Sequence, residues 1–363
     1  MLENWLQAVP KNLSTGLQTY MIGKKISIYQ NSLPSLKKVK IGILSDSHPS
    51  NELWRKQFYS LAHHFPGLII TDLGQLRKNN PEMLIPVIKE LIAGGIFPII
   101  VSQDESLING LFLAYRSFGQ ILKLLIIDEK IRYSPKNTKN DYINKLVEKE
   151  IMAYLEPSII GYQIHFTDPE LLNFIQEHFN DHVRLGGMLD NMAFTEPIIR
   201  DADLMLFHLS SIKHADAPGV KDNSPNGFNG IDACQLCRYA GFSDKLSSAG
   251  IFGYSSKHDD ANQTAQLIAQ MVWYLIDGFY HRQNEFPVSL AGLQSYVIEG
   301  KKLGYAITFW KSKSSGRWWM QMPGHDLNLT DRHSLIPCTV DDYNMAMSGE
   351  LPDRLVHVIQ KSL

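Results

Sequence analysis

Short apolar runs of strand length alternate with helical segments along most of this 363-residue chain. The first run, 39–44, is followed by helical spacing through Leu53, Trp54, Phe58 and Leu61. The pattern repeats, with strands expected at 67–71, 96–101, 121–127, 159–165, 204–209 and 249–254, and helices at 51–64, 80–93, 107–117, 168–178, 230–239 and 262–282. This alternation predicts an α/β fold with a parallel sheet covered on both faces. Functional side chains of such sheets lie at the carboxyl ends of the strands.

The pattern changes near the C-terminus. Residues 305–310 and 317–322 flank a turn-rich segment, which predicts a hairpin, and 340–347 and 352–362 have the spacing of short helices. Trp310, Trp318 and Trp319 of this region are interpreted as a satellite core in preference to an aromatic ligand platform. We therefore divide the chain into an N-terminal extension, a main α/β domain and a C-terminal appendage, at 1–37, 38–284 and 285–363.

The charge balance argues against a nucleic-acid partner. The chain has 35 Lys and Arg against 37 Asp and Glu, whereas phosphate neutralisation needs a clustered basic excess. No apolar run approaches the roughly 20 residues of a membrane span. The N-terminus lacks the basic and apolar regions of a secretory signal, and three cysteines fit a reducing compartment, so we expect a cytoplasmic protein with no membrane partner.

An ordered series of motifs lies within the main domain. The segment 201–213, Asp-Ala-Asp-Leu-Met-Leu-Phe-His-Leu-Ser-Ser-Ile-Lys, leads into Ala217-Pro218-Gly219 and then into 224–228, which opens a helix. This order resembles the ureohydrolase superfamily of arginase, agmatinase and especially formimidoylglutamase. The resemblance extends from about Lys38 to Arg282. It implies an arginase-like three-layer αβα fold with a mostly parallel central sheet.

The resemblance also implies a chemistry. Active members of the superfamily hold two manganese ions through carboxylates and histidines at strand ends, and a bridging hydroxide attacks a guanidinium or formimidoyl carbon. Two cations lower the pKa of the shared water, and oxygen-rich ligands suit manganese.

Four motifs depart from the superfamily pattern. The first superfamily motif is G-G-D-H, and this chain has Ser102-Gln103-Asp104-Glu105 in its place. Asp104 is therefore kept, and Glu105 takes the position of a metal-binding histidine. Residues 128–132 take the place of the second superfamily motif, D-A-H-x-D. Asp128 is kept there, but Lys130 replaces the histidine and Arg132 replaces a carboxylate.

The other two motifs also change. His208 and Ser210 stand at the two acidic positions of the third motif. Gly253 stands at the glutamate of E-x-N-P, which faces the amidine group of the substrate in the superfamily.

These substitutions oppose a metal cluster. Neither Lys130 nor Arg132 has a free lone pair near neutral pH, and each would repel a nearby cation by about 4 kcal/mol at an effective dielectric of 20. We therefore expect no dimanganese site and no cofactor. We hypothesise instead that Lys130 and Arg132 enter the pocket and pair with Asp104, Glu105 and Asp128; the alternative is that both side chains point to solvent.

A single-metal site of Glu105, Asp128 and His208 is the residual metal hypothesis, since these types can form a facial ligand set. We prefer the interpretation that His208 is a buried, hydrogen-bonded histidine and not a metal ligand. Cys234 and Cys237 have C-x-x-C spacing but lie in a helical pattern without a second pair, so they are interpreted as structural thiols. Asp46-Ser47-His48, after the first strand, is assigned a capping or loop role.

Three functions follow from these observations. The preferred one is a ureohydrolase-fold protein that has lost metal catalysis and serves as a binding, regulatory or assembly subunit, with a second copy, an active paralogue or a small polar ligand as partner. The alternative is an active amidinohydrolase of formimidoylglutamase type with manganese in a non-standard site. The third is a metal-free hydrolase with Asp128 or Glu105 as general base near His208.

Overall fold

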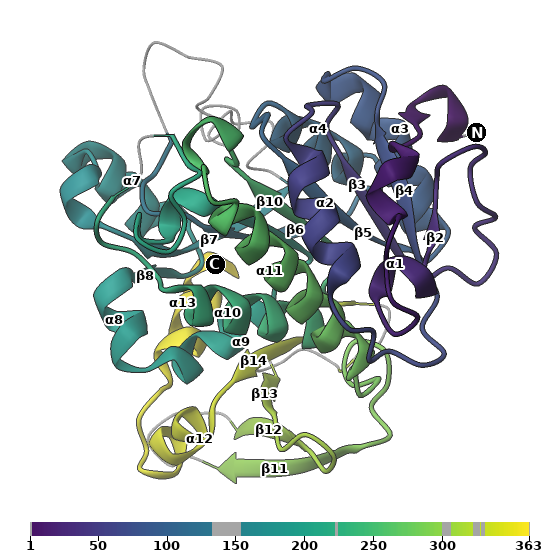
Figure 1. The fold of residues 1–363 in the computed structure, drawn as a ribbon. Coiled ribbons are helices and arrows are strands. Elements are labelled where there is room, and N and C mark those ends of the chain that lie inside the picture. Colours follow the sequence, from purple (N-terminus) through teal and green to yellow (C-terminus); the bar gives the residue numbers. More distant parts are fainter. Residues whose placement is uncertain are drawn as a thin grey trace.

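A mostly parallel sheet runs through the larger part of the molecule (Figure 1). The computed structural model describes residues 2–132, 154–221, 224–299, 306–321, 327 and 331–362. Within them the sheet has ten strands, in the order β1 (Leu6–Gln7), β4 (Ile70–Leu76), β3 (Ile41–Ser45), β5 (Phe97–Ser102), β10 (Ser248–Phe252), β9 (Leu204–His208), β6 (Leu122–Ile127), β7 (Leu155–Tyr162) and β8 (His182–Arg184), with β2 (Ser27–Ile28) also on β4. All its pairings are parallel except β1 with β4.

Helices cover both faces of this sheet, which confirms the three-layer αβα fold class (Figure 1). One apolar core includes α2 (Asn51–Ser60), α8 (Leu185–Asp190), α9 (Glu196–Arg200), α10 (Gly230–Phe242) and α11 (Gln263–Tyr280), with the short α1 (Ile22–Lys25) beside α2. The other includes α3 (Pro81–Ala93), α4 (Leu107–Arg116) and α7 (Pro169–His178). Strand residues alternate between the two cores, as Ile43 and Leu44 of β3 do.

Helix starts follow local sequence. The Asn80 side chain accepts from the Glu82 amide before Pro81, and Asp168 accepts from the Glu170 amide before Pro169. The short polar residue satisfies a free N–H, and proline fits the first turn because it needs no donor there. The expected helix at 51–64 ends earlier, at Ser60.

The N-terminal region adds strands to the sheet. Both β1 and β2 pair with β4, so parts of the segment 1–37 complete one edge of the main domain. These strands are two residues long and carried no periodic pattern from which to predict them.

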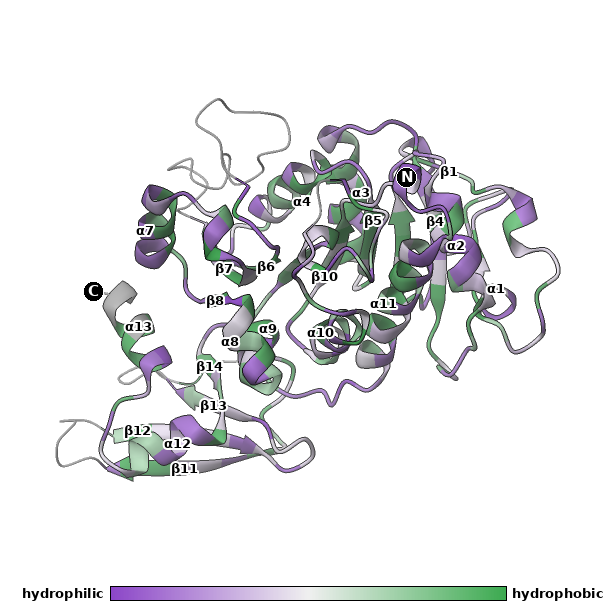
Figure 2. Cartoon of the chain, turned by 60° about the vertical axis from the view of Figure 1, so that its left-hand side comes forward, coloured by the Kyte–Doolittle hydropathy of each residue, from purple (hydrophilic) through white to green (hydrophobic). Residues whose placement is uncertain are grey.

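The appendage contains a second, antiparallel sheet of β11 (Leu293–Glu299), β12 (Ala306–Ser312), β13 (Trp318–Gln321) and β14 (Leu335–Cys338), with α12 (Val340–Met347) and α13 (Asp353–Ser362) (Figure 2). The expected hairpin and both helices are confirmed. Trp310 and Trp319 are paired across the hairpin, and Trp319 is buried. The tryptophans contribute to satellite cores, as the sequence predicted.

Polar contacts attach the appendage to the amino end of the main sheet. Arg200 of α9 donates to the carbonyls of Trp318 (3.1 Å) and Cys338 (3.3 Å). Lys245 Nζ lies 2.8 Å from Asp201 Oδ1 and 2.9 Å from His333 Nδ1. None of the described helices is long and apolar enough to cross a membrane.

Candidate functional site

The carboxyl ends of four adjacent strands bring the motif residues together. β5, β10, β9 and β6 are neighbours in the sheet. Glu105 lies shortly after β5, Gly253 follows β10, His208 ends β9 and Asp128 follows β6. Because parallel strands end at the same edge, residues far apart in the sequence meet there.

Arg132 occupies the middle of this cluster. Its Nε donates to Asp128 Oδ2 at 2.8 Å, and its Nη2 lies 2.8 Å from both His208 Nδ1 and Ser210 Oγ. Asp128 is fully buried and the Arg132 side chain is 12% exposed. A buried carboxylate is costly unless it is paired and hydrogen-bonded, so the guanidinium stabilises the strand end.

His208 joins Asp128 to Glu105. Its Nδ1 accepts from the Ser210 amide (3.1 Å) and from Arg132, so the geometry places its proton on Nε2, which donates to Glu105 Oε1 at 2.9 Å. Asp128 and Glu105 therefore lie at opposite nitrogens of the ring. The three side chains do not converge on one point, and His208 has the geometry of a hydrogen-bonded buried histidine.

The hypothesis of internal cations is confirmed for Arg132 with Asp128 and wrong for Lys130. Lys130 Nζ lies 3.7 Å from Glu129 Oε1, and its side chain is 33% exposed. Asp104 does not pair with these cations as expected: its Oδ1 accepts from the Ser106 amide (2.9 Å) at the start of α4. Four carbons separate Lys130 Nζ from its Cα, so this flexible side chain reaches solvent while Arg132 fills the pocket.

Burial and charge act in opposite directions on the carboxyl groups. Burial would raise the pKa of Asp128 and of Glu105. In Asp128 the charges of Arg132 and His208 with the hydrogen bonds from Arg132 and Ser210 together outweigh burial. In Glu105 the hydrogen bond and charge of His208 with the charge of Arg132 do so, and both pKa values therefore lie below their usual range. Burial raises the pKa of Glu129 to about 7, against the opposing charge of Lys130.

Gly253 closely approaches His208. Its φ is +92°, and a Cβ built there would lie 2.7 Å from the His208 ring. A side chain at this position would therefore be strained and would displace the imidazole. The absence of a side chain at Gly253 therefore leaves room for the His208 ring.

Sequence reasoning overlooked the extent of one buried network. Asp46 accepts from the His48 amide (2.7 Å), as a capping residue does, but also from the Ser102 hydroxyl and the Gln103 amide (2.6 Å). It therefore connects the ends of β3 and β5 and positions the segment that holds Glu105. Glu129 was also overlooked: its buried Oε2 has no hydrogen-bond partner among the described residues. A charged residue within two positions of the end of an apolar strand is the signal common to both.

The donor set does not fit a dimanganese cluster. The Asp128 oxygens are engaged by Arg132, and His208 Nδ1 accepts from the same guanidinium. Among the described residues, no group of three or more His, Cys, Asp or Glu side chains is arranged to hold a metal. A divalent cation in this pocket would first have to displace the Arg132 side chain.

The two helical cysteines are not part of the site. Cys234 and Cys237 are free and buried on α10. Burial raises the pKa of Cys234 to about 12 and that of Cys237 well above its usual value. Thiolates are the metal-binding and nucleophilic form, so these thiols have structural character.

Comparison with known proteins identifies the fold. No family model and no curated protein matches the sequence. A formiminoglutamase from Trypanosoma cruzi, solved with Mn²⁺, has a TM-score of 0.60 at 15% identity, covering 69% of this chain and 97% of that one. A formimidoylglutamase from Bacillus subtilis has a TM-score of 0.60 at 11% identity, covering 76% of this chain and 95% of that one.

A third solved structure, the agmatine ureohydrolase of Thermoplasma volcanium, has a TM-score of 0.53 at 16% identity, covering 74% of this chain and 97% of that one. The chain therefore has the ureohydrolase fold, as the motif order predicted.

Proposed function

We propose that this ureohydrolase-fold chain is a non-catalytic binding, regulatory or assembly subunit that has lost the dimanganese site. The observation that carries the proposal is the contact of Arg132 with Asp128, His208 and Ser210. An internal guanidinium supplies positive charge to the strand ends where metal ions would otherwise supply it, and it engages both oxygens of Asp128 and Nδ1 of His208.

The other substitutions support the same conclusion. Gly253 provides no carboxylate toward an amidine group, and the adjacent His208 ring fills the space where a larger side chain would start. Lys130 adds a second cation close to the pocket. No hydrolytic step can be assigned to a metal-activated water in this arrangement.

The decisive experiment combines metal analysis with activity assays on the full chain. The protein is incubated with excess Mn²⁺, desalted and analysed for bound metal, and then assayed for ammonia, formamide or urea release from arginine, agmatine and formimidoylglutamate. We expect substoichiometric metal and no turnover. Two equivalents of manganese with metal-dependent turnover would favour the active amidinohydrolase instead.

A designed reversal tests the cause. The quadruple variant Lys130→His, Arg132→Asp, His208→Asp and Gly253→Glu restores superfamily side chains and removes the ring that Gly253 contacts. We expect it to bind manganese in calorimetric titrations, whereas an Arg132→Lys variant, which keeps the charge, is the matched control and does not. Equal metal binding by both variants would count against the guanidinium as the cause.

A further inference from the structure

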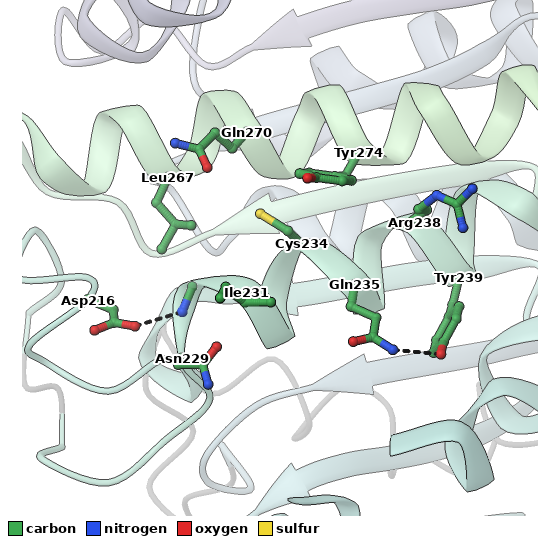
Figure 3. Close-up of a pocket in the computed structure, with 11 residues that line it drawn as sticks. Asp216, Asn229, Ile231, Cys234, Gln235, Arg238, Tyr239, Leu267, Gln270 and Tyr274 are labelled. Atoms are coloured by element: carbon green, nitrogen blue, oxygen red, sulfur yellow. Dashed lines mark hydrogen bonds between the residues drawn. The ribbon is translucent and has the colours of Figure 1, made fainter. Parts of the chain in front are cut away.

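A groove of about 580 Å³ opens between α10 and α11 on the surface of the main domain (Figure 3). We call it the α10–α11 groove. It is lined by Asp216, Asn229, Gly230, Ile231, Cys234, Gln235, Arg238, Tyr239, Leu267, Gln270 and Tyr274. Asp216 and Arg238 are the charged side chains among these described residues, and they lie at opposite ends of the groove (Figure 3).

Two glycines explain why the groove opens where it does. A Cβ on Gly241 would overlap the Leu275 carbonyl oxygen, and one on Gly278 would overlap the Arg238 carbonyl oxygen. The helix backbones therefore touch near their C-terminal ends. Nearer the N-terminal ends, the Leu267 side chain of α11 lies beside Gly230 of α10.

An apolar side chain projects at the rim. Ile231 is 78% exposed, and Tyr274 across the groove is 37% exposed. A small molecule confined to the groove would leave much of the Ile231 side chain in water, because this residue at the rim is 78% exposed. A second protein surface would cover both residues, and such apolar contact stabilises association.

We propose that the α10–α11 groove is the interface for a second copy of this chain, related by a two-fold axis perpendicular to α10 near Cys234. A two-fold axis presents the same patch on both copies with its direction reversed. Asp216 of one copy then faces Arg238 of the other, and this contact occurs twice.

The spacing of the charges suits this arrangement. Asp216 Oδ2 accepts from the Gly230 amide at 2.7 Å, so it marks the start of α10. Arg238 lies eight residues later, about 12 Å along the helix axis. The Arg238 side chain is 44% exposed, with Nε on Asp277 at 2.7 Å, so its orientation is set while part of the guanidinium faces outward.

The reversed direction also places Ile231 favourably. Ile231 near the start of α10 in one copy approaches Tyr239 and Tyr274, near the other end of the groove, in the second copy. Tyrosine and arginine are enriched among the residues that contribute most to binding at protein interfaces. The formal net charge of −2 per chain adds little repulsion between copies. The inference does not rest on the state of the Arg132 pocket.

The first test measures oligomeric state. Light scattering after size exclusion and sedimentation velocity are performed on the full chain over a wide concentration range. We expect a concentration-dependent dimer, and Ile231→Asp to raise the dissociation constant about tenfold or more. Val288→Asp is the matched control, because Val288 is 55% exposed but lies outside the groove; it leaves the constant unchanged.

A charge swap tests the two-fold geometry. Arg238→Glu and Asp216→Lys each place like charges opposite each other twice, so each variant alone is expected to be monomeric. Mixing the two restores both attractive contacts and gives a mixed dimer. Lys89→Glu, an exposed position on α3, is the charge control and keeps the wild-type constant.

Circular dichroism and thermal midpoints establish that the variants fold. If Asp216→Lys does not fold, because Asp216 accepts from the Gly230 amide at the start of α10, the Ile231→Asp and Arg238→Glu variants decide the question. A wild-type chain that stays monomeric overturns the proposal and leaves the groove to a small molecule. A dimer unaffected by both Ile231→Asp and Arg238→Glu also overturns it.

Discussion

The guanidinium of Arg132 lies against the buried carboxylate of Asp128, with Nε 2.8 Å from Oδ2, where the interior strand β6 ends. The same guanidinium reaches His208 and Ser210, which come from β9 and its following turn. One side chain therefore connects two strand ends and places a positive charge beside a buried carboxylate.

We expect Arg132→Ala to lower the free energy of unfolding by about 3 kcal/mol, because removing one partner of a buried ion pair is strongly destabilising. Urea denaturation measures this change. Lys130→Ala is the control: its partly exposed pairing with Glu129 contributes about 0.5 kcal/mol or less. Equal losses in the two variants would show that Arg132 does not hold the strand ends.

Gly253→Ala is expected to destabilise the protein by about 2 kcal/mol or more, through positive φ and the contact with His208. Gly67→Ala separates these effects, because Gly67 has φ +82° and a Cβ placed there would have no neighbour within 4 Å. The thermal midpoint of both variants gives the comparison. Adding His208→Ala should recover part of the Gly253→Ala loss and none of the Gly67→Ala loss.

The lowered pKa of His333 leads us to expect that the free energy of unfolding depends on pH. Burial, with Lys245 and Lys123 nearby, lowers the pKa of His333 to about 3. The unfolded chain takes up a proton near pH 6.5 that the folded chain does not bind, so stability falls as pH decreases below 6.5, by about 1.4 kcal/mol per pH unit until about pH 3.

The measurement is the urea midpoint as a function of pH for the wild type and His333→Gln. The glutamine keeps an acceptor for Lys245 Nζ but does not titrate. Its profile should be flatter between about pH 6 and pH 4. Parallel profiles for the two proteins would contradict the assignment.

The cysteines are expected to resist alkylation in the folded state. All three are free and buried, and burial raises their pKa values. Mass spectrometry after iodoacetamide treatment near neutral pH should find the native chain unmodified and the urea-unfolded chain modified at every cysteine. Native labelling at the unfolded rate would indicate an accessible thiolate at one of these positions.

Arg200→Ala should loosen the appendage. The buried guanidinium donates to the Trp318 and Cys338 carbonyls and lies 4.3 Å from the centroid of the Trp319 ring. We expect a loss of about 3 kcal/mol and faster proteolysis within 285–363. Arg184→Ala, at an exposed position, is the control, and equal proteolysis of the two variants would show that Arg200 does not attach the appendage.

Local sequence pattern predicted much of the fold. The strand and helix periodicities over 39–282 and the hairpin around 312–316 are properties of neighbouring residues, and the structure confirms them. The two-residue strands β1 and β2 and the outer strands β11 and β14 lacked such a pattern. They form because a sheet edge is available to pair with them.

The sequence by itself determined the ureohydrolase-like order of motifs and the side-chain types at their positions. Only the tertiary structure decided that Arg132, and not Lys130, pairs with Asp128, and that Gly253 leaves room for His208. Arg132 and His208 are 76 residues apart, and Glu105 and His208 are 103 apart. Contacts over such separations depend on the strand order of the sheet, which brings the ends of β5, β10, β9 and β6 to one edge.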